Sequence, residues 1–72
     1  MTHMIEAIEV NGKREPLSAA TLSAFLIDKG IDVNGRGVAV AVNGTVVPRA
    51  AWPQTALHGG DAVEIVGAKQ GG

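Results

Sequence analysis

The chain contains 72 residues, of which 46% are hydrophobic and 18% are charged, and its formal net charge at pH 7 is −1. A chain of this length forms one small domain with a small core, which argues against an independent enzyme with an enclosed active site. The composition excludes a disordered chain, no apolar run reaches the ~18 residues of a membrane span, and the chain opens with no secretory signal.

The chain is expected to open with a β-hairpin. Ile8 and Val10 alternate with Glu9 within residues 5–10, a pattern that predicts a half-buried strand. The pair Asn11-Gly12 follows directly and indicates a tight hairpin turn, because both central turn residues need a positive φ. We expect a short edge strand over residues 13–15 to return from this turn and to end before Pro16.

The next segment predicts the main helix, from Leu17 to Lys29. The apolar residues that recur on one helical face are Leu22, Phe25 and Leu26. Thr21 is the expected N-cap, with Ser18 as the alternative. Gly30 suits the position just after the helix, where a left-handed residue is common, and residues 30–37 are expected to form a loop.

Two further strands are predicted after this loop. Val38–Val42 is apolar on both faces, which favours a strand in the middle of a sheet. Asn43-Gly44 gives a second hairpin signal, and the chain is expected to return through residues 45–47 and to stop at Pro48.

The remaining residues complete the predicted domain. Residues 50–57 are expected to be a connector, in which Trp52 either closes the edge of the core or serves as an exposed docking anchor. Residues 59–61 predict a turn, and Ala62–Val66 predicts a last strand with Val63 and Ile65 on one side.

This element order predicts an α+β fold in which one main helix packs on a mixed sheet of four or five strands. Residues 1–3 resemble the remnant of a cloning site, so the domain is assigned to residues 4–66 and a flexible tail to residues 67–72. Ala39 and Ala41 are expected on the sheet face that the helix leaves uncovered. We hypothesise that this face, which also carries Glu9, contacts a partner.

Few residues could carry catalysis. The carboxylates show no metal-ligand spacing, and the chain has no cysteine for disulfides, metal–thiolate ligation or thiol chemistry. His58 is interpreted as an exposed turn residue, and Asp61 as a residue that bonds within its turn. Residues 35–37 contain two glycines but lack the other features of a phosphate-binding loop. We therefore predict no catalytic residue, no metal site and no bound cofactor.

The last two residues, Gly71 and Gly72, suggest a different chemistry. The chain ends there on a carboxylate that is ionised at neutral pH and could attack the α-phosphate of ATP to form an acyl-adenylate. Six residues after Val66 extend up to about 20 Å, and glycine is thin enough to enter a narrow channel. The catalytic groups would have to come from a partner enzyme.

Several segments together form a more specific pattern. They are Ala41–Arg49, Trp52, Gly60-Asp61, Glu64–Val66 and Gly71-Gly72. With this pattern the chain resembles the sulfur carrier family of bacterial thiamin biosynthesis, the ThiS family, over essentially everything from Met4 onward.

The resemblance implies a β-grasp, or ubiquitin-like, fold and a carrier that is not itself an enzyme. It implies that a ThiF- or MoeB-like E1 enzyme adenylates the carboxylate of Gly72 with ATP and magnesium. Sulfur from a cysteine desulfurase-derived persulfide would convert this carboxylate to a thiocarboxylate, which would donate its sulfur to a ThiG-like thiazole synthase. Gly71 would support the working end, and Arg49, Lys69 and Gln70 are possible partner contacts.

The same resemblance leaves other functions open. The small subunit of molybdopterin synthase shares the expected fold, the Gly-Gly end and the chemistry. A ubiquitin-like modifier or a binding module of the same fold is a further alternative. In each case the scattered Lys and Arg residues predict no nucleic-acid or membrane partner, and we expect a cytoplasmic protein that is monomeric when free.

Overall fold

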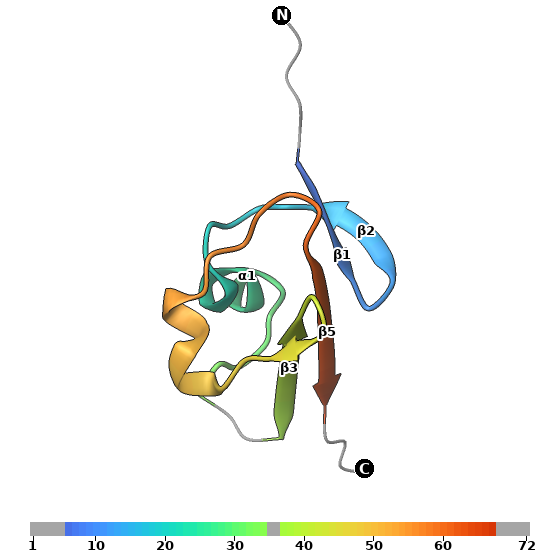
Figure 1. The fold of residues 1–72 in the computed structure, drawn as a ribbon. Coiled ribbons are helices and arrows are strands. Elements are labelled where there is room, and N and C mark those ends of the chain that lie inside the picture. Colours follow the sequence, from blue (N-terminus) through green and yellow to red (C-terminus); the bar gives the residue numbers. More distant parts are fainter. Residues whose placement is uncertain (1–5, 35–36, 68–72) are drawn as a thin grey trace, which may run out of the picture.

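The computed structural model describes residues 6–34 and 37–67, which form a single mixed sheet with one α-helix and one 3₁₀ helix (Figure 1). The elements in chain order are β1 (Ala7–Val10), β2 (Lys13–Pro16), α1 (Leu22–Asp28), β3 (Val38–Val42), β4 (Thr45–Val46), the 3₁₀ helix η1 (Arg49–Gln54) and β5 (Ala62–Gly67). The five strands lie in the order β2-β1-β5-β3-β4. Strands β1 and β5 are parallel, and the other neighbours are antiparallel. The predicted α+β architecture is therefore confirmed, with five strands.

Both predicted hairpin turns are present. Asn11 and Gly12 have φ values of 51° and 85°, and Asn43 and Gly44 have 52° and 84°. Two successive positive φ values define the type I′ turn that suits the twist of a hairpin. The edge strand β2 runs one residue further than expected, because Pro16 pairs with β1 at the sheet edge, where its missing N–H is tolerated.

The helix is shorter than predicted and begins at Leu22, so the expectation of a start at Leu17 is wrong. Residues 17–20 bond to distant segments instead: the Leu17 amide donates to the Glu6 carbonyl at 2.8 Å, and the Ala20 carbonyl accepts from Leu57 at 2.9 Å. Thr21 is the N-cap, as predicted, since its hydroxyl accepts from the Ala24 amide at 3.2 Å.

The end of the helix and the middle of the sheet are close to the predictions. Helix α1 ends at Asp28, and Gly30 follows with a φ of 83°. Strand β3 has neighbours on both sides, as predicted for a strand inside the sheet, and β5 occupies the centre. Strand β4 is one residue shorter than expected, although the Val47 amide still donates to the Val40 carbonyl at 2.8 Å.

The expected connector of residues 50–57 contains the 3₁₀ helix η1, which the sequence analysis did not predict. Trp52 lies in η1 and is only 2% exposed. Its indole N–H donates to the Val47 carbonyl at 2.9 Å. Trp52 therefore closes the core, and its interpretation as an exposed docking anchor is wrong.

The core lies between the sheet and the two helices, which cover the same face (Figure 1). Its buried apolar members are Ile8, Val10, Leu22, Phe25, Leu26, Val40, Trp52, Leu57 and Val63. No helix in the described part of the chain is long and apolar enough to cross a membrane.

Candidate functional site

Strand β5 is the element that leads to the predicted working end. It is the central strand of the sheet, and it ends at Gly67, one residue into the segment predicted as a tail. The predicted site residues Lys69, Gln70, Gly71 and Gly72 lie outside the residues that the structure describes. Five residues follow Gly67, the last of them Gly72, and a stretch of this length can span at most about 18 Å. The end of β5 therefore sets where the terminal carboxylate can reach.

The first half of β5 is held by the backbone of β1. The Glu9 amide donates to the Asp61 carbonyl at 2.9 Å, and the Asn11 amide donates to the Val63 carbonyl at 2.9 Å. Strand β1 then turns away at Asn11-Gly12, and the side chain of Asn11 takes over. Its Oδ1 accepts from the Ile65 amide at 2.8 Å, and its Nδ2 donates to the Ile65 carbonyl at 3.2 Å.

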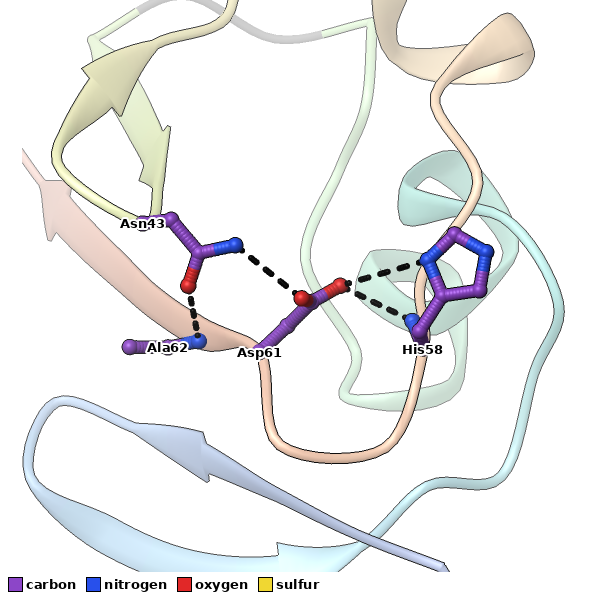
Figure 2. Close-up of polar contacts among 4 residues, drawn as sticks. All are labelled: Asn43, His58, Asp61 and Ala62. Carbon is purple, nitrogen blue, oxygen red and sulfur yellow. Dashed lines mark hydrogen bonds and ion pairs between the residues drawn. The ribbon is translucent and has the colours of Figure 1, made fainter.

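The start of β5 is held by a second asparagine, from the β3–β4 turn (Figure 2). Asn43 Oδ1 accepts from the Ala62 amide at 2.9 Å, and Nδ2 donates to Asp61 Oδ1 at 3.0 Å. The other oxygen of Asp61 accepts from the His58 amide at 2.8 Å and lies 3.8 Å from the imidazole Nδ1. The interpretation of Asp61 as a turn-stabilising residue and of His58 as an exposed turn residue is confirmed.

These bonds stabilise the ionised form of Asp61. The hydrogen bond from the Asn43 side chain is the main reason that the pKa of Asp61 lies below its ordinary value, and the His58 amide lowers it further. Desolvation opposes the shift but does not reverse it. The cluster thus joins two turns to the first residues of β5 and has the character of a structural brace.

The sheet face opposite the helices is open and partly apolar. Strand register places Ala39 beside Val66, and Ala41 between Glu64 and Val46. Val66 is 63% exposed and Val46 is 68% exposed. Glu9, also exposed, pairs with Arg14 on the β1 side of the same face. The predicted partner surface therefore exists as a face, with an apolar strip that ends next to the last residues of β5.

Arg49 is the one predicted contact residue within the described part of the chain. It is exposed at the start of η1, and its guanidinium carbon lies 5.4 Å from the centre of the Trp52 ring. Its segment follows the edge strand β4, which lies two strands away from β5 in the sheet. Its role as a partner contact stays a prediction.

Sequence reasoning missed the contribution of Asn11 to this site. The Asn11-Gly12 pair is accounted for by its turn alone, and nothing local indicates a partner 54 residues away. The available signal is that both hairpin turns carry asparagine, whose amide can both donate and accept. No three His, Asp or Glu side chains within residues 6–34 and 37–67 are grouped so that they could hold a metal ion.

A mixed five-stranded sheet with one helix packed across a face is the architecture of the β-grasp, ubiquitin-like proteins. The ThiS family matches residues 3–72, and the chain belongs to this family. The sulfur carrier protein ThiS of Thermus thermophilus is 36% identical over 63 residues, which are 88% of this chain and 95% of that protein.

Two solved structures of a thiamine biosynthesis protein from Geobacter metallireducens share the fold. The crystal structure, in which the protein is named ThiS, has a TM-score of 0.74 at 30% identity, and the match covers 92% of this chain and 99% of that chain. The solution NMR structure has a TM-score of 0.74 at 29% identity, and the match covers 92% of this chain and 87% of that chain. The resemblance to the ThiS family and the predicted β-grasp fold are therefore confirmed.

Proposed function

We propose that this protein is the sulfur carrier of thiamin biosynthesis and that it carries sulfur on the carboxylate of Gly72. The family match over residues 3–72 is the observation that supports this function most strongly. The relative from Thermus thermophilus, which is named a sulfur carrier protein, supports it further. The Gly71-Gly72 end supplies a suitable carboxylate. The chain has no cysteine, so a thiol of its own cannot hold the sulfur.

The chemistry takes place in partner enzymes. A carboxylate oxygen of Gly72 attacks the α-phosphate of ATP in a ThiF- or MoeB-like E1 enzyme, and pyrophosphate leaves. The terminal sulfur of a cysteine desulfurase-derived persulfide then displaces AMP and forms an acyl disulfide with the carrier. A thiol of the partner protein attacks the persulfide-derived S–S bond, so that a disulfide forms on the partner and the carrier is released with a terminal thiocarboxylate. A ThiG-like thiazole synthase takes the sulfur from it. ATP and magnesium serve the partner enzyme, and the carrier itself contributes no catalytic residue.

The carrier contributes a folded platform and a narrow terminal segment to the reaction. The bonds around β5 hold a rigid platform from which the last five residues reach at most about 18 Å. Gly71 gives the reacting end a narrow approach, because glycine has no Cβ. The open face with Val46 and Val66 is the surface that we assign to the partner enzymes, and Arg49, Lys69 and Gln70 are further contacts to be tested.

The decisive measurement is the intact mass of the carrier. We expect incubation with the E1-like enzyme of the same genome, ATP, magnesium and a persulfide donor to raise the mass by about 16 Da, the difference between sulfur and oxygen. Fragmentation should place the change on Gly72, and a chain that lacks Gly72 should show none. An unchanged mass with an active partner, or an unimpaired deletion, would contradict the proposal.

A second step separates thiamin biosynthesis from the alternatives. The thiocarboxylated carrier is offered in parallel to thiazole synthase and to the large subunit of molybdopterin synthase. Sulfur loss to thiazole synthase supports the proposal, whereas loss only to the other enzyme would assign the carrier to molybdopterin synthesis. An isopeptide-linked adduct would assign it to the protein modifiers.

A further inference from the structure

The side chain of Asn11 completes the sheet where the backbone of β1 no longer can. Up to Val63, the backbone of β1 and the backbone amide of Asn11, the residue that follows it, bond to β5. A longer parallel strand would next offer a backbone carbonyl and a backbone amide to Ile65. The Asn11 side-chain amide supplies both, with Oδ1 2.8 Å from the Ile65 nitrogen and Nδ2 3.2 Å from the Ile65 oxygen. One side chain therefore replaces a ladder position.

The bonds from the Asn11 side chain matter for the tail because they lie close to the end of β5. Ile65 is two residues before Gly67, where β5 ends. On the other side, β3 pairs with β5 as far as Val38 and Gly67. The Asn11 amide therefore decides whether the last residues of β5 are held from both sides or from β3 alone. A strand held from one side opens more readily than a strand between two neighbours.

Asn43 provides an internal comparison. It occupies the same turn position as Asn11, with a φ of 52° against 51°. Its amide also makes two bonds to the β5 region, to the Ala62 amide at 2.9 Å and to Asp61 Oδ1 at 3.0 Å. These bonds lie at the start of β5, away from the tail. The two asparagines therefore hold opposite ends of one strand by the same kind of contact.

We propose that Asn11 is a positioning residue for sulfur loading, which fixes the end of β5 so that the Gly72 carboxylate is presented to the E1-like enzyme in a restricted region of space. The inference rests on the proposed function of Gly72. Asn11 does not touch the reacting atoms; it acts through Ile65. Without the Asn11 contacts, residues Ile65–Gly67 must become ordered when the carrier binds the enzyme. This cost raises the KM for the carrier and leaves kcat nearly unchanged.

The variants Asn11→Gly and Asn43→Gly form a matched pair. Glycine accepts the positive φ of both turns, so each variant removes the amide bonds and retains the hairpin. Both are expected to lower the melting temperature. Only Asn11→Gly is expected to raise the KM for adenylation, by about three- to tenfold, the size expected for losing one or two exposed hydrogen bonds. Asn11→Asp retains the acceptor for the Ile65 amide and should lie between this variant and the native chain.

Hydrogen exchange measures the same effect without any partner. The Val66 amide should exchange about three- to tenfold faster in Asn11→Gly, with little change in Asn43→Gly. Equal exchange in the two variants overturns the inference whether or not the chain is loaded with sulfur. Equal KM values overturn it as well, when the native chain gains its sulfur. A native chain that gains no sulfur contradicts the proposed function instead, and the exchange comparison then decides on Asn11 alone.

Discussion

Asp61 connects two turns to the central strand through one carboxylate. Its two oxygens accept from the Asn43 side chain at 3.0 Å and from the His58 amide at 2.8 Å. These bonds are stronger to the ionised form, and for this reason the pKa of Asp61 lies below its ordinary value. A carboxylate whose pKa is lowered on folding contributes stability above its unfolded pKa and loses that contribution as the pH falls through the lower, folded value.

We predict that Asp61→Asn lowers the free energy of unfolding by about 1 kcal/mol at pH 7, because one charge-assisted hydrogen bond is lost. The difference from the native chain should begin to shrink as the pH falls below about 4, the ordinary pKa of an aspartate, and should disappear as the pH falls through the lower pKa of the native carboxylate. Urea unfolding followed by the fluorescence of Trp52, which is the single tryptophan, measures both values. The exposed Glu64→Gln variant is the control and should change stability little. A pH-independent difference would contradict the assignment.

Among the single elements, local sequence signals predicted the two hairpin turns but not the start of helix α1. Asn11-Gly12 and Asn43-Gly44 predicted their turns because positive φ is a property of those residues themselves. The start of α1 could not be predicted in the same way. Residues 17–20 have a composition compatible with a helix. Their backbone groups bond instead to Glu6, which comes earlier in the chain, and to Leu57, which comes much later. Tertiary pairing overrode local propensity there.

We predict that the hydroxyl of Thr21, and not that of Ser18, stabilises α1. Thr21→Ala removes the bond to the Ala24 amide and should cost about 1 kcal/mol of unfolding free energy. Ser18 lies before the helix, and its hydroxyl contacts Asp28 at 3.3 Å on the surface. Ser18→Ala should therefore change stability by less than about 0.5 kcal/mol. Chemical denaturation of both variants decides the matter, and equal losses would show that the N-cap bond contributes nothing particular.

For the molecule as a whole, the sequence predicted the components of the sheet but not their order. The last strand of the chain lies at the centre, between β1 and β3. This order depends on pairing between residues more than 50 positions apart, such as Val10 with Val63, and no local pattern contains it. The contribution of Asn11 to the end of β5 was missed for the same reason. Gly72 could be proposed from the sequence alone because the proposed chemistry needs a terminal carboxylate, and its role stays a prediction.

The central position of β5 also determines which surface lies beside the start of the proposed sulfur-carrying end. Three large apolar side chains are exposed in the described part of the chain: Val46, Val66 and Ile27, at 68%, 63% and 57%. Val46 and Val66 belong to the open sheet face, on either side of the Ala39–Ala41 stretch of β3. Ile27 belongs to α1, on the other side of the sheet. Val66 is thus an exposed apolar side chain on the open face, one residue before the end of β5 at Gly67.

We therefore predict that Val66→Asp and Val46→Asp raise the KM for sulfur loading by about tenfold or more, because a charge would be buried against the partner. Ile27→Asp is the matched control, with similar exposure and the same change in charge, and it should load normally. Thermal unfolding should differ little among the three variants, since exposed substitutions stay within about 0.5 kcal/mol. Steady-state kinetics with the E1-like enzyme provides the measurement. If the sheet variants load normally and the helix variant does not, the partner surface lies on the helical side.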